Sequence, residues 1–269
     1  MRSAKRGQAI TGAALALAIA LGAAPLAAQS PPTGSSWVEA GGFYHHVTRD
    51  FGDWRGAYAR AVLAGARNVW YLDAKAQRAF NDDGFYGSLA DVHTWSSRFY
   101  TQVGVGAGTG RYVLPALRED LALNFKLGRL RSVILTVGET YVNSQLIYED
   151  KSFFGSLSWY ASGSVLLEAG GRANWSDPGA VRTGRGSGSL TLGRAGATQV
   201  TLRGGAGTEG YQLVGAATAL RRFESEEASA MLRHWHGHGH GFGLVVEGDW
   251  YHNPFYTRAG GQLGIFRAW

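Results

Sequence analysis

Residues 117–127 read LREDLALNFKL, and two kinds of side chain alternate along this stretch. On one face of an extended chain lie the apolar residues Leu117, Leu121, Leu123, Phe125 and Leu127. On the other lie Arg118, Asp120, Asn124 and Lys126. A helix has 3.6 residues per turn and would mix the two sets, so the period of two predicts a β-strand. A turn and a second alternating stretch follow at 131–143, which predicts a β-hairpin.

The same alternation recurs along the chain in stretches of about ten to fourteen residues. We predict fourteen strands, at 36–48, 53–65, 68–80, 84–96, 98–108, 114–127, 131–143, 149–161, 164–175, 184–194, 197–207, 225–236, 241–252 and 256–269. Twelve strands are also compatible, because Leu213–Leu220 could extend a strand or form a lid. A tilted strand needs about 9–11 residues to cross a bilayer. The expected fold is therefore all-β, a transmembrane antiparallel up-and-down barrel.

A soluble β-sandwich would show the same periodicity, because it buries its apolar face and leaves its charged face in water. The composition favours the barrel. The chain has nine Trp, twelve Tyr and twelve Phe, and aromatic rings form girdles at both membrane interfaces of such barrels. It also has 40 glycines, which are unusual in ordinary strands but relieve crowding in a curved wall. Single-chain bacterial barrels have an even number of strands, as predicted for this chain.

The N-terminus has the layout of a secretory signal peptide. Basic residues come first, an apolar run follows from Ala13 to Ala24, and small residues continue to Ala28. A spanning helix needs about 20 apolar residues, so the run is too short for one. We expect a signal peptide at 1–28, a short periplasmic segment at 29–35 and the barrel at 36–269. An uncleaved anchor is the alternative.

The chain carries 26 Lys and Arg against 20 Asp and Glu, a formal charge of +6. Three of the basic residues, Arg2, Lys5 and Arg6, belong to the export signal, so the mature excess falls to about +3. This removes the reason to expect a nucleic-acid partner. There is no cysteine, which excludes disulfides and thiolate metal sites. We expect no cofactor.

The last predicted strand ends on the final residue. Leu263, Ile265 and Trp269 share its apolar face, as expected of a strand that closes the barrel. We interpret these three as a C-terminal assembly signal read by the barrel assembly machinery, although Arg267 departs from the usual pattern. With both ends periplasmic, short turns lie on that side, and the longer connections 109–113, 144–148, 176–183 and 208–224 lie outside.

Charged residues cluster on the face away from lipid, so we expect them to line the lumen. This set is Arg60, Asp73, Lys75, Asp91, His93, Arg118, Asp120, Lys126, Glu168, Arg172, Arg203, Glu247, Asp249 and Arg258. About eight strands give a filled interior and sixteen or more an aqueous channel, and fourteen lies between these limits. The charges could seal the bore by pairing across it, or line a narrow conduit.

Histidines suggest two further chemistries. His234, His236, His238 and His240 alternate, and four stacked imidazoles could bind zinc, copper or nickel. The tract overlaps a predicted turn, so a polar rim is the simpler interpretation. A lipid-modifying barrel enzyme would need a serine paired with a histidine. The candidate bases are His45, His46 and His252, with Ser176 or Ser225 as nucleophile, but no nucleophile motif surrounds either serine.

Four stretches resemble the YaiO-family outer-membrane barrels of Gram-negative bacteria: 53–60 (DWRGAYAR), 148–150 (YED), 174–179 (NWSDPG) and 253–258 (NPFYTR). The resemblance extends over about residues 36–269. It implies a barrel in the outer membrane, surrounded by outer-membrane lipids. Some members are encoded beside polysaccharide-handling genes, which implies polysaccharide or envelope proteins as partners.

The sequence thus predicts a narrow outer-membrane channel for polar solutes or saccharides. One alternative is a non-conducting barrel that scaffolds a polysaccharide-related envelope complex. The other is the lipid-modifying enzyme.

Overall fold

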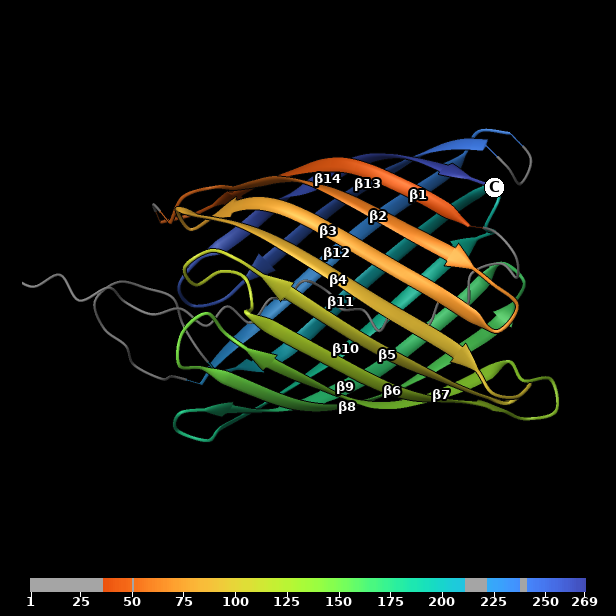
Figure 1. Ribbon diagram of the computed structural model, residues 1–269, viewed down its shortest axis with the longest axis horizontal. Helices are drawn as coiled ribbons and strands as arrows, with labels where there is room; N and C mark the ends of the chain where they lie inside the picture. Colours follow the sequence, from red (N-terminus) through yellow and green to blue (C-terminus); the bar gives the residue numbers. More distant parts are fainter. Residues whose placement is uncertain (1–35, 50, 211–221, 238–240) are drawn as a thin grey trace, which may run out of the picture.

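Fourteen antiparallel strands close into a single barrel in the computed structural model, which describes residues 36–49, 51–210, 222–237 and 241–269 (Figure 1). The strands are β1 (Trp37–Val47), β2 (Trp54–Ala64), β3 (Asn68–Ala79), β4 (Asp82–Thr94), β5 (Phe99–Gly108), β6 (Leu117–Leu127), β7 (Val133–Asn143), β8 (Glu149–Ser162), β9 (Val165–Asp177), β10 (Val181–Gly193), β11 (Thr198–Glu209), β12 (Phe223–Trp235), β13 (Gly241–His252) and β14 (Thr257–Ala268). The predicted all-β barrel and its count of fourteen are confirmed.

The first and last strands close the ring. β1 pairs with β14 in continuous register from Trp37 opposite Ala268 to Val47 opposite Arg258. Beyond this ladder, Ser36 and Trp269 exchange two backbone hydrogen bonds, of 3.0 and 2.9 Å. Because every strand is paired on both sides, no strand edge is left open, as a membrane barrel requires.

The two ends of the barrel differ. We call the end where Ser36 meets Trp269 the termini end and the opposite one the loop end.

The connection between β9 and β10 at the loop end is shorter than predicted. β9 continues to Asp177 and β10 starts at Val181, so residues 178–180 form the connection in place of the expected 176–183. Pairing continues this far because Ser176 still lies opposite Val181. The possible lid at Leu213–Leu220, the signal peptide and the segment 29–35 lie outside the described residues.

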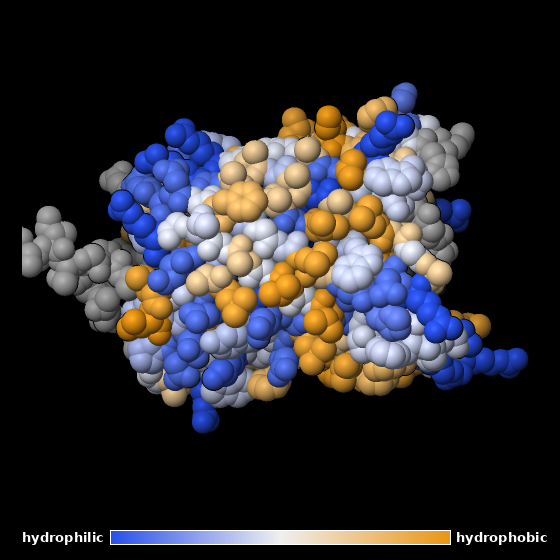
Figure 2. Space-filling view, in the orientation of Figure 1, coloured by the Kyte–Doolittle hydropathy of each residue, from blue (hydrophilic) through white to orange (hydrophobic). Residues whose placement is uncertain are grey.

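Large apolar side chains are exposed on the outer face. Leu157, Leu202, Leu263 and Ile265 are 46–64 % exposed, values that would be costly for so many residues in water. In Figure 2, apolar side chains form patches along the middle of the view, and protruding hydrophilic ones are most frequent at its ends. The lipid-facing surface that the alternation predicts is therefore present.

The inner face is polar. Asn124, Thr136 and Ser158 point inward and are almost fully buried, and Thr136 donates a 2.7 Å hydrogen bond to Asn124. A sandwich would fill this space with a dry apolar layer, and the closed ring of strands excludes that alternative. Among the described residues, no helix is long and apolar enough to cross a membrane.

Candidate functional site in the barrel lumen

Strand register fixes which side chains face the lumen, because residues directly opposite each other share a face. Arg60, for example, lies opposite Glu39 on β1 and Asp73 on β3, and all three point inward. Of the fourteen charged residues predicted to line the lumen, twelve do: Arg60, Asp73, Lys75, Arg118, Asp120, Lys126, Glu168, Arg172, Arg203, Glu247, Asp249 and Arg258.

Asp91 and His93 are the two corrections, because both lie on the outer face. Asp91 is opposite Trp70 and Val103, which are exposed outward. On β4 the inward positions are even-numbered, so these odd-numbered polar residues belong to the outside. Asn68 at the start of β3 donates to both Asp91 carboxylate oxygens, at 2.9 and 2.7 Å. Asn68 and Asp91 belong to the polar rim at the termini end. In the sequence, polar residues of this rim look the same as polar residues that line the lumen.

Ion pairs follow the wall from β12 to β3. Glu39 on β1 accepts a hydrogen bond from Arg233 on β12 and lies 3.7 Å from Arg60 on β2. Arg60 in turn donates to Asp73 on β3 at 2.9 Å. Glu39 is almost fully buried beneath the two guanidinium groups. These four groups form one chain of charge contacts on this side of the barrel.

A second set lies on β11, β13, β14 and β1. Asp249 is 2.5 Å from His45 Nε2 and accepts a 3.2 Å hydrogen bond from Arg258. Nearer the termini end, Glu247 accepts from Gln262 at 2.6 Å and lies 3.9 Å from Arg203. These partners are one or two strands apart, whereas the Arg233–Glu39 pair joins strands that are three apart. Most ion pairs of the described residues thus connect neighbouring parts of the wall.

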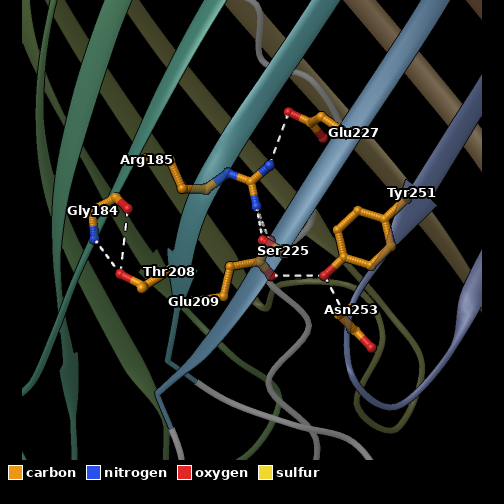
Figure 3. A network of polar contacts seen from close by, with 8 residues as sticks. All are labelled: Gly184, Arg185, Thr208, Glu209, Ser225, Glu227, Tyr251 and Asn253. Carbon is orange, nitrogen blue, oxygen red and sulfur yellow. Dashed lines mark hydrogen bonds and ion pairs between the residues drawn. The ribbon is translucent and has the colours of Figure 1, made fainter.

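A third network, shown in Figure 3, holds β10, β11, β12 and β13 together near the loop end. Glu209 accepts hydrogen bonds from Arg185, Ser225 and Tyr251, and Asn253 donates to the Tyr251 hydroxyl at 3.1 Å. Arg185 also lies 3.2 Å from Glu227. Arg185 is neutralised by these two carboxylates.

Sequence reasoning missed eight carboxylates, arginines and histidines of the lumen: Glu39, His45, Asp82, Asp150, Arg185, Glu209, Glu227 and Arg233. The reason is clearest on β10, whose first half reads VRTGRGSG. After Val181, glycines alternate there with polar residues, so no run of apolar residues indicates which face meets lipid. Counting back from Leu190 and Leu192 would have placed Arg185 inward.

Glycines allow large inward side chains to lie flat against the wall. A Cβ at Gly106 would overlap the Tyr86 hydroxyl, and a Cβ at Gly264 would overlap that of Tyr58. Phe154 covers Gly138 in the same way. The rings therefore lie along the wall over neighbouring glycines, which leaves more of the bore unfilled.

Part of the interior is accessible to solvent. The side chains of Arg60, Asp73 and Arg203 point inward, yet they are 36, 34 and 31 % exposed to solvent. A filled barrel of packed side chains would bury such groups, as small eight-stranded barrels do. Ser187, which also faces inward, is exposed as well. Space for water is therefore present beside the charged wall.

The loop end narrows over part of the bore. A cluster of buried residues lies there, which we call the loop-end cluster: Val47, Trp54, Ala79, Phe80, Val113, Tyr251 and Tyr256. Burial raises the pKa of Tyr256 above its ordinary value, so its hydroxyl stays protonated. Asp82 accepts the backbone N–H groups of Arg111, Tyr112 and Val113 at 3.0 Å each, which folds the 109–116 loop inward against this cluster.

The histidine and serine candidates are engaged elsewhere. His234 points outward and bonds to the Thr198 hydroxyl at 2.8 Å, while His238 and His240 lie outside the described residues. Over the described part of the chain, no three His, Cys, Asp or Glu residues gather as a metal site. Ser225 donates to Glu209, Ser176 donates to Asp150, and His252 contacts Thr257 at 2.8 Å.

The closed strand ring, apolar outer face and charged interior define a β-barrel protein of the bacterial outer membrane. The chain belongs to the YaiO membrane β-barrel family, whose model matches residues 36–212. The resemblance of its motifs to that family is thereby confirmed.

Solved structures with the same fold are outer-membrane barrels. The CymD monoaromatic hydrocarbon channel has a TM-score of 0.55 at 8 % identity, over 87 % of this chain and 88 % of that one. An outer membrane channel from Pseudomonas putida has a TM-score of 0.54 at 9 % identity, over 91 and 98 %. A bacterial polysaccharide outer membrane secretin has a TM-score of 0.53 at 6 % identity, over 87 and 97 %. No curated protein matches the sequence.

Proposed function

We propose that the protein is a narrow channel for polar solutes, saccharides among them. One observation carries this proposal: the inward side chains of Arg60, Asp73 and Arg203 keep about a third of their surface in contact with solvent, while their ion pairs join strands that are adjacent or two apart. Polar solutes need such a lining, because each hydrogen bond that they lose to water must be replaced. We place the loop end outside the cell and the termini end in the periplasm, following the usual asymmetry of turns and loops.

The channel is narrowest at the loop end in this proposal. The loop 109–116 lies against the loop-end cluster because Asp82 holds three of its backbone N–H groups. Hydrogen bonds to a charged acceptor contribute about 1.5–3 kcal/mol each. Replacing Asp82 with alanine should therefore release this loop and widen the entrance.

Planar-bilayer recording of the refolded full chain tests the proposal. We expect stable small openings for the wild-type protein and a larger single-channel conductance for Asp82→Ala. Asp83→Ala is the matched control, because Asp83 is the next residue but points outward and is 71 % exposed. In liposome swelling with glucose and sucrose, Asp82→Ala should likewise give faster swelling than the wild-type protein, and Asp83→Ala should match the wild-type rate.

The alternative of a non-conducting scaffold is favoured by the same loop-end cluster, which closes part of the entrance. The two functions separate in the same recordings. If correctly folded protein is silent both as wild type and as Asp82→Ala, the channel is refuted and the scaffold is supported.

We further propose that Leu263, Ile265 and Trp269 present the last strand to the assembly machinery, since Leu263 and Ile265 are exposed outward on β14.

A further inference from the structure

Arg172 differs from most inward cations, because it has no carboxylate partner. It lies near the middle of β9, directly opposite Arg185 on β10 and Phe154 on β8. Its guanidinium group lies 5.5 Å from the centroid of the Phe154 ring. Within the ranges that the structure describes, it donates no hydrogen bond and joins no ion pair. A guanidinium group has five N–H donors, so these donors are left for water or for a solute.

The neighbouring charges are already paired. Arg118 donates to Asp120 at 2.7 and 2.9 Å, and Arg185 is held by Glu209 and Glu227. Arg118, Asp120 and Arg185 are the charged groups that act on Arg172. The charges of these two arginines are thus balanced by carboxylates. Arg172 is therefore the group in this part of the lumen that is free to take an acceptor.

Small polar residues surround Arg172 along the wall. One ladder step toward the termini end, the inward positions are Ser156, Gly170 and Ser187. One step toward the loop end, they are Ser152, Asn174 and Thr183. Ser152 and Ser156 are buried, whereas Ser187 is exposed and Thr183 is half-buried, so hydroxyl groups are accessible on the β10 side of Arg172. This is a suitable lining for a solute with several hydroxyl groups.

Two other inward cations also have no carboxylate partner among the described residues and lie near an aromatic ring instead. Lys75 on β3 lies 5.9 Å from the Phe43 ring centroid, and Lys126 on β6 lies 5.4 Å from that of Tyr100. By contrast, the inward carboxylates without an ion pair among the described residues, Asp82, Asp150 and Glu168, accept hydrogen bonds from neutral groups. Arg172, Lys75 and Lys126 are thus the inward cations that have no carboxylate partner among the described residues.

We propose that Arg172 binds the oxyanion group of an anionic saccharide in the lumen and that the channel prefers such solutes to neutral ones. This inference rests on the proposed channel function and adds its substrate class. The planar guanidinium fork matches a carboxylate or a phosphate with two parallel hydrogen bonds. The exposed hydroxyl of Ser187, one ladder step away, would contact the sugar hydroxyls.

Calorimetric titration of the full chain, folded in detergent micelles, tests the binding site. D-glucuronate, glucose 6-phosphate and glucose are the probes, since they share a pyranose ring and differ in charge. We expect both anionic sugars to bind more tightly than glucose, and the tighter of the two identifies the preferred oxyanion. Arg172→Gln should lose this preference by about tenfold, a difference of about 1.4 kcal/mol. Arg182→Gln, on the outer face of β10, should keep it.

Arg172→Lys keeps the charge without the fork, so intermediate binding would support bidentate recognition. Equal binding of glucuronate and glucose by the wild-type protein would overturn the site, whether or not any variant folds. Reversal potentials in planar bilayers provide the second readout. An anion preference lost in Arg172→Gln supports the proposal, whereas conduction without charge preference refutes the site and leaves the channel. Silent bilayers with intact glucuronate binding refute the channel and leave the site.

Discussion

At the scale of single residues, the width of the lumen depends on pairs formed by a glycine and a large side chain on the next strand. Tyr86 lies over Gly106 on β5 and is thereby kept against the wall. The sequence shows an excess of glycine, but its pattern does not show which glycine accommodates which ring. The pairing of a particular glycine with a particular ring depends on the register between neighbouring strands, and this register is determined by contacts along the whole sheet.

Gly106→Ala tests this arrangement. The new methyl group would overlap the Tyr86 hydroxyl, so the ring must turn toward the bore. We expect lower single-channel conductance and a loss of stability of about 1–3 kcal/mol, as for other overpacked sites. Gly87→Ala is the control, since its nearest neighbour would be 3.6 Å away. Adding Tyr86→Ala to Gly106→Ala should restore conductance; if it does not, the ring is not the obstruction.

Individual lumen residues could be predicted wherever apolar neighbours reveal the lipid face. Arg118 and Asp120 were placed correctly because Leu121 and Leu123 share their strand. Arg185 was missed because glycine surrounds it, and Asp91 was misplaced because polar residues at a strand end resemble lumen residues. Arg172 was placed inward from the sequence, but its lack of a carboxylate partner depends on side-chain positions that alternation does not determine.

At the scale of an element, the turn between β1 and β2 depends on one carboxylate. Asp53 accepts hydrogen bonds from the Tyr44 hydroxyl, the Val47 N–H at 3.2 Å and the His46 ring at 2.9 Å. The Tyr44 hydrogen bond is the largest cause that holds the pKa of Asp53 below its ordinary value of 3.8, and the Val47 amide adds to it. The turn is thus tied to the ends of β1 and β2 by the ionised form of Asp53.

The turn should accordingly loosen in acid. A carboxylate whose pKa is lower in the folded state stabilises that state above its unfolded pKa, and this contribution is lost as the pH falls through the folded value. In NMR spectra of the micellar protein, the Val47 amide shift should titrate with a midpoint below 3.8. The titration should be absent in Asp53→Asn. A midpoint at or above 3.8 in the wild-type protein would contradict the role of these hydrogen bonds.

At the scale of the whole molecule, closure of the sheet could be predicted from local patterns, because the alternation of apolar and polar residues within most strands indicates which face meets lipid. The folding of the loop 109–116 against the loop-end cluster could not be predicted in this way. The cluster joins Val47, Phe80, Val113 and Tyr256, which are far apart in sequence and carry no common pattern. Contacts of this kind arise only once the barrel has brought the strand ends together.

If the outer face of the barrel meets lipid, a charge introduced there should destabilise the protein more than a charge introduced at a turn. Leu157 points outward from β8, is 51 % exposed and lies opposite Leu135 and Ala169. On a surface in water, Leu157→Arg would change stability by no more than about 0.5 kcal/mol. In a bilayer, an arginine on the lipid face costs up to about 2–4 kcal/mol near the midplane. Urea unfolding in lipid vesicles should therefore show a large loss for Leu157→Arg. Leu130→Arg, in the turn between β6 and β7 where Leu130 is 87 % exposed, should be nearly neutral. Equal stability of the two variants would mean that the apolar face of β8 does not meet lipid, and the channel proposal would fail with it.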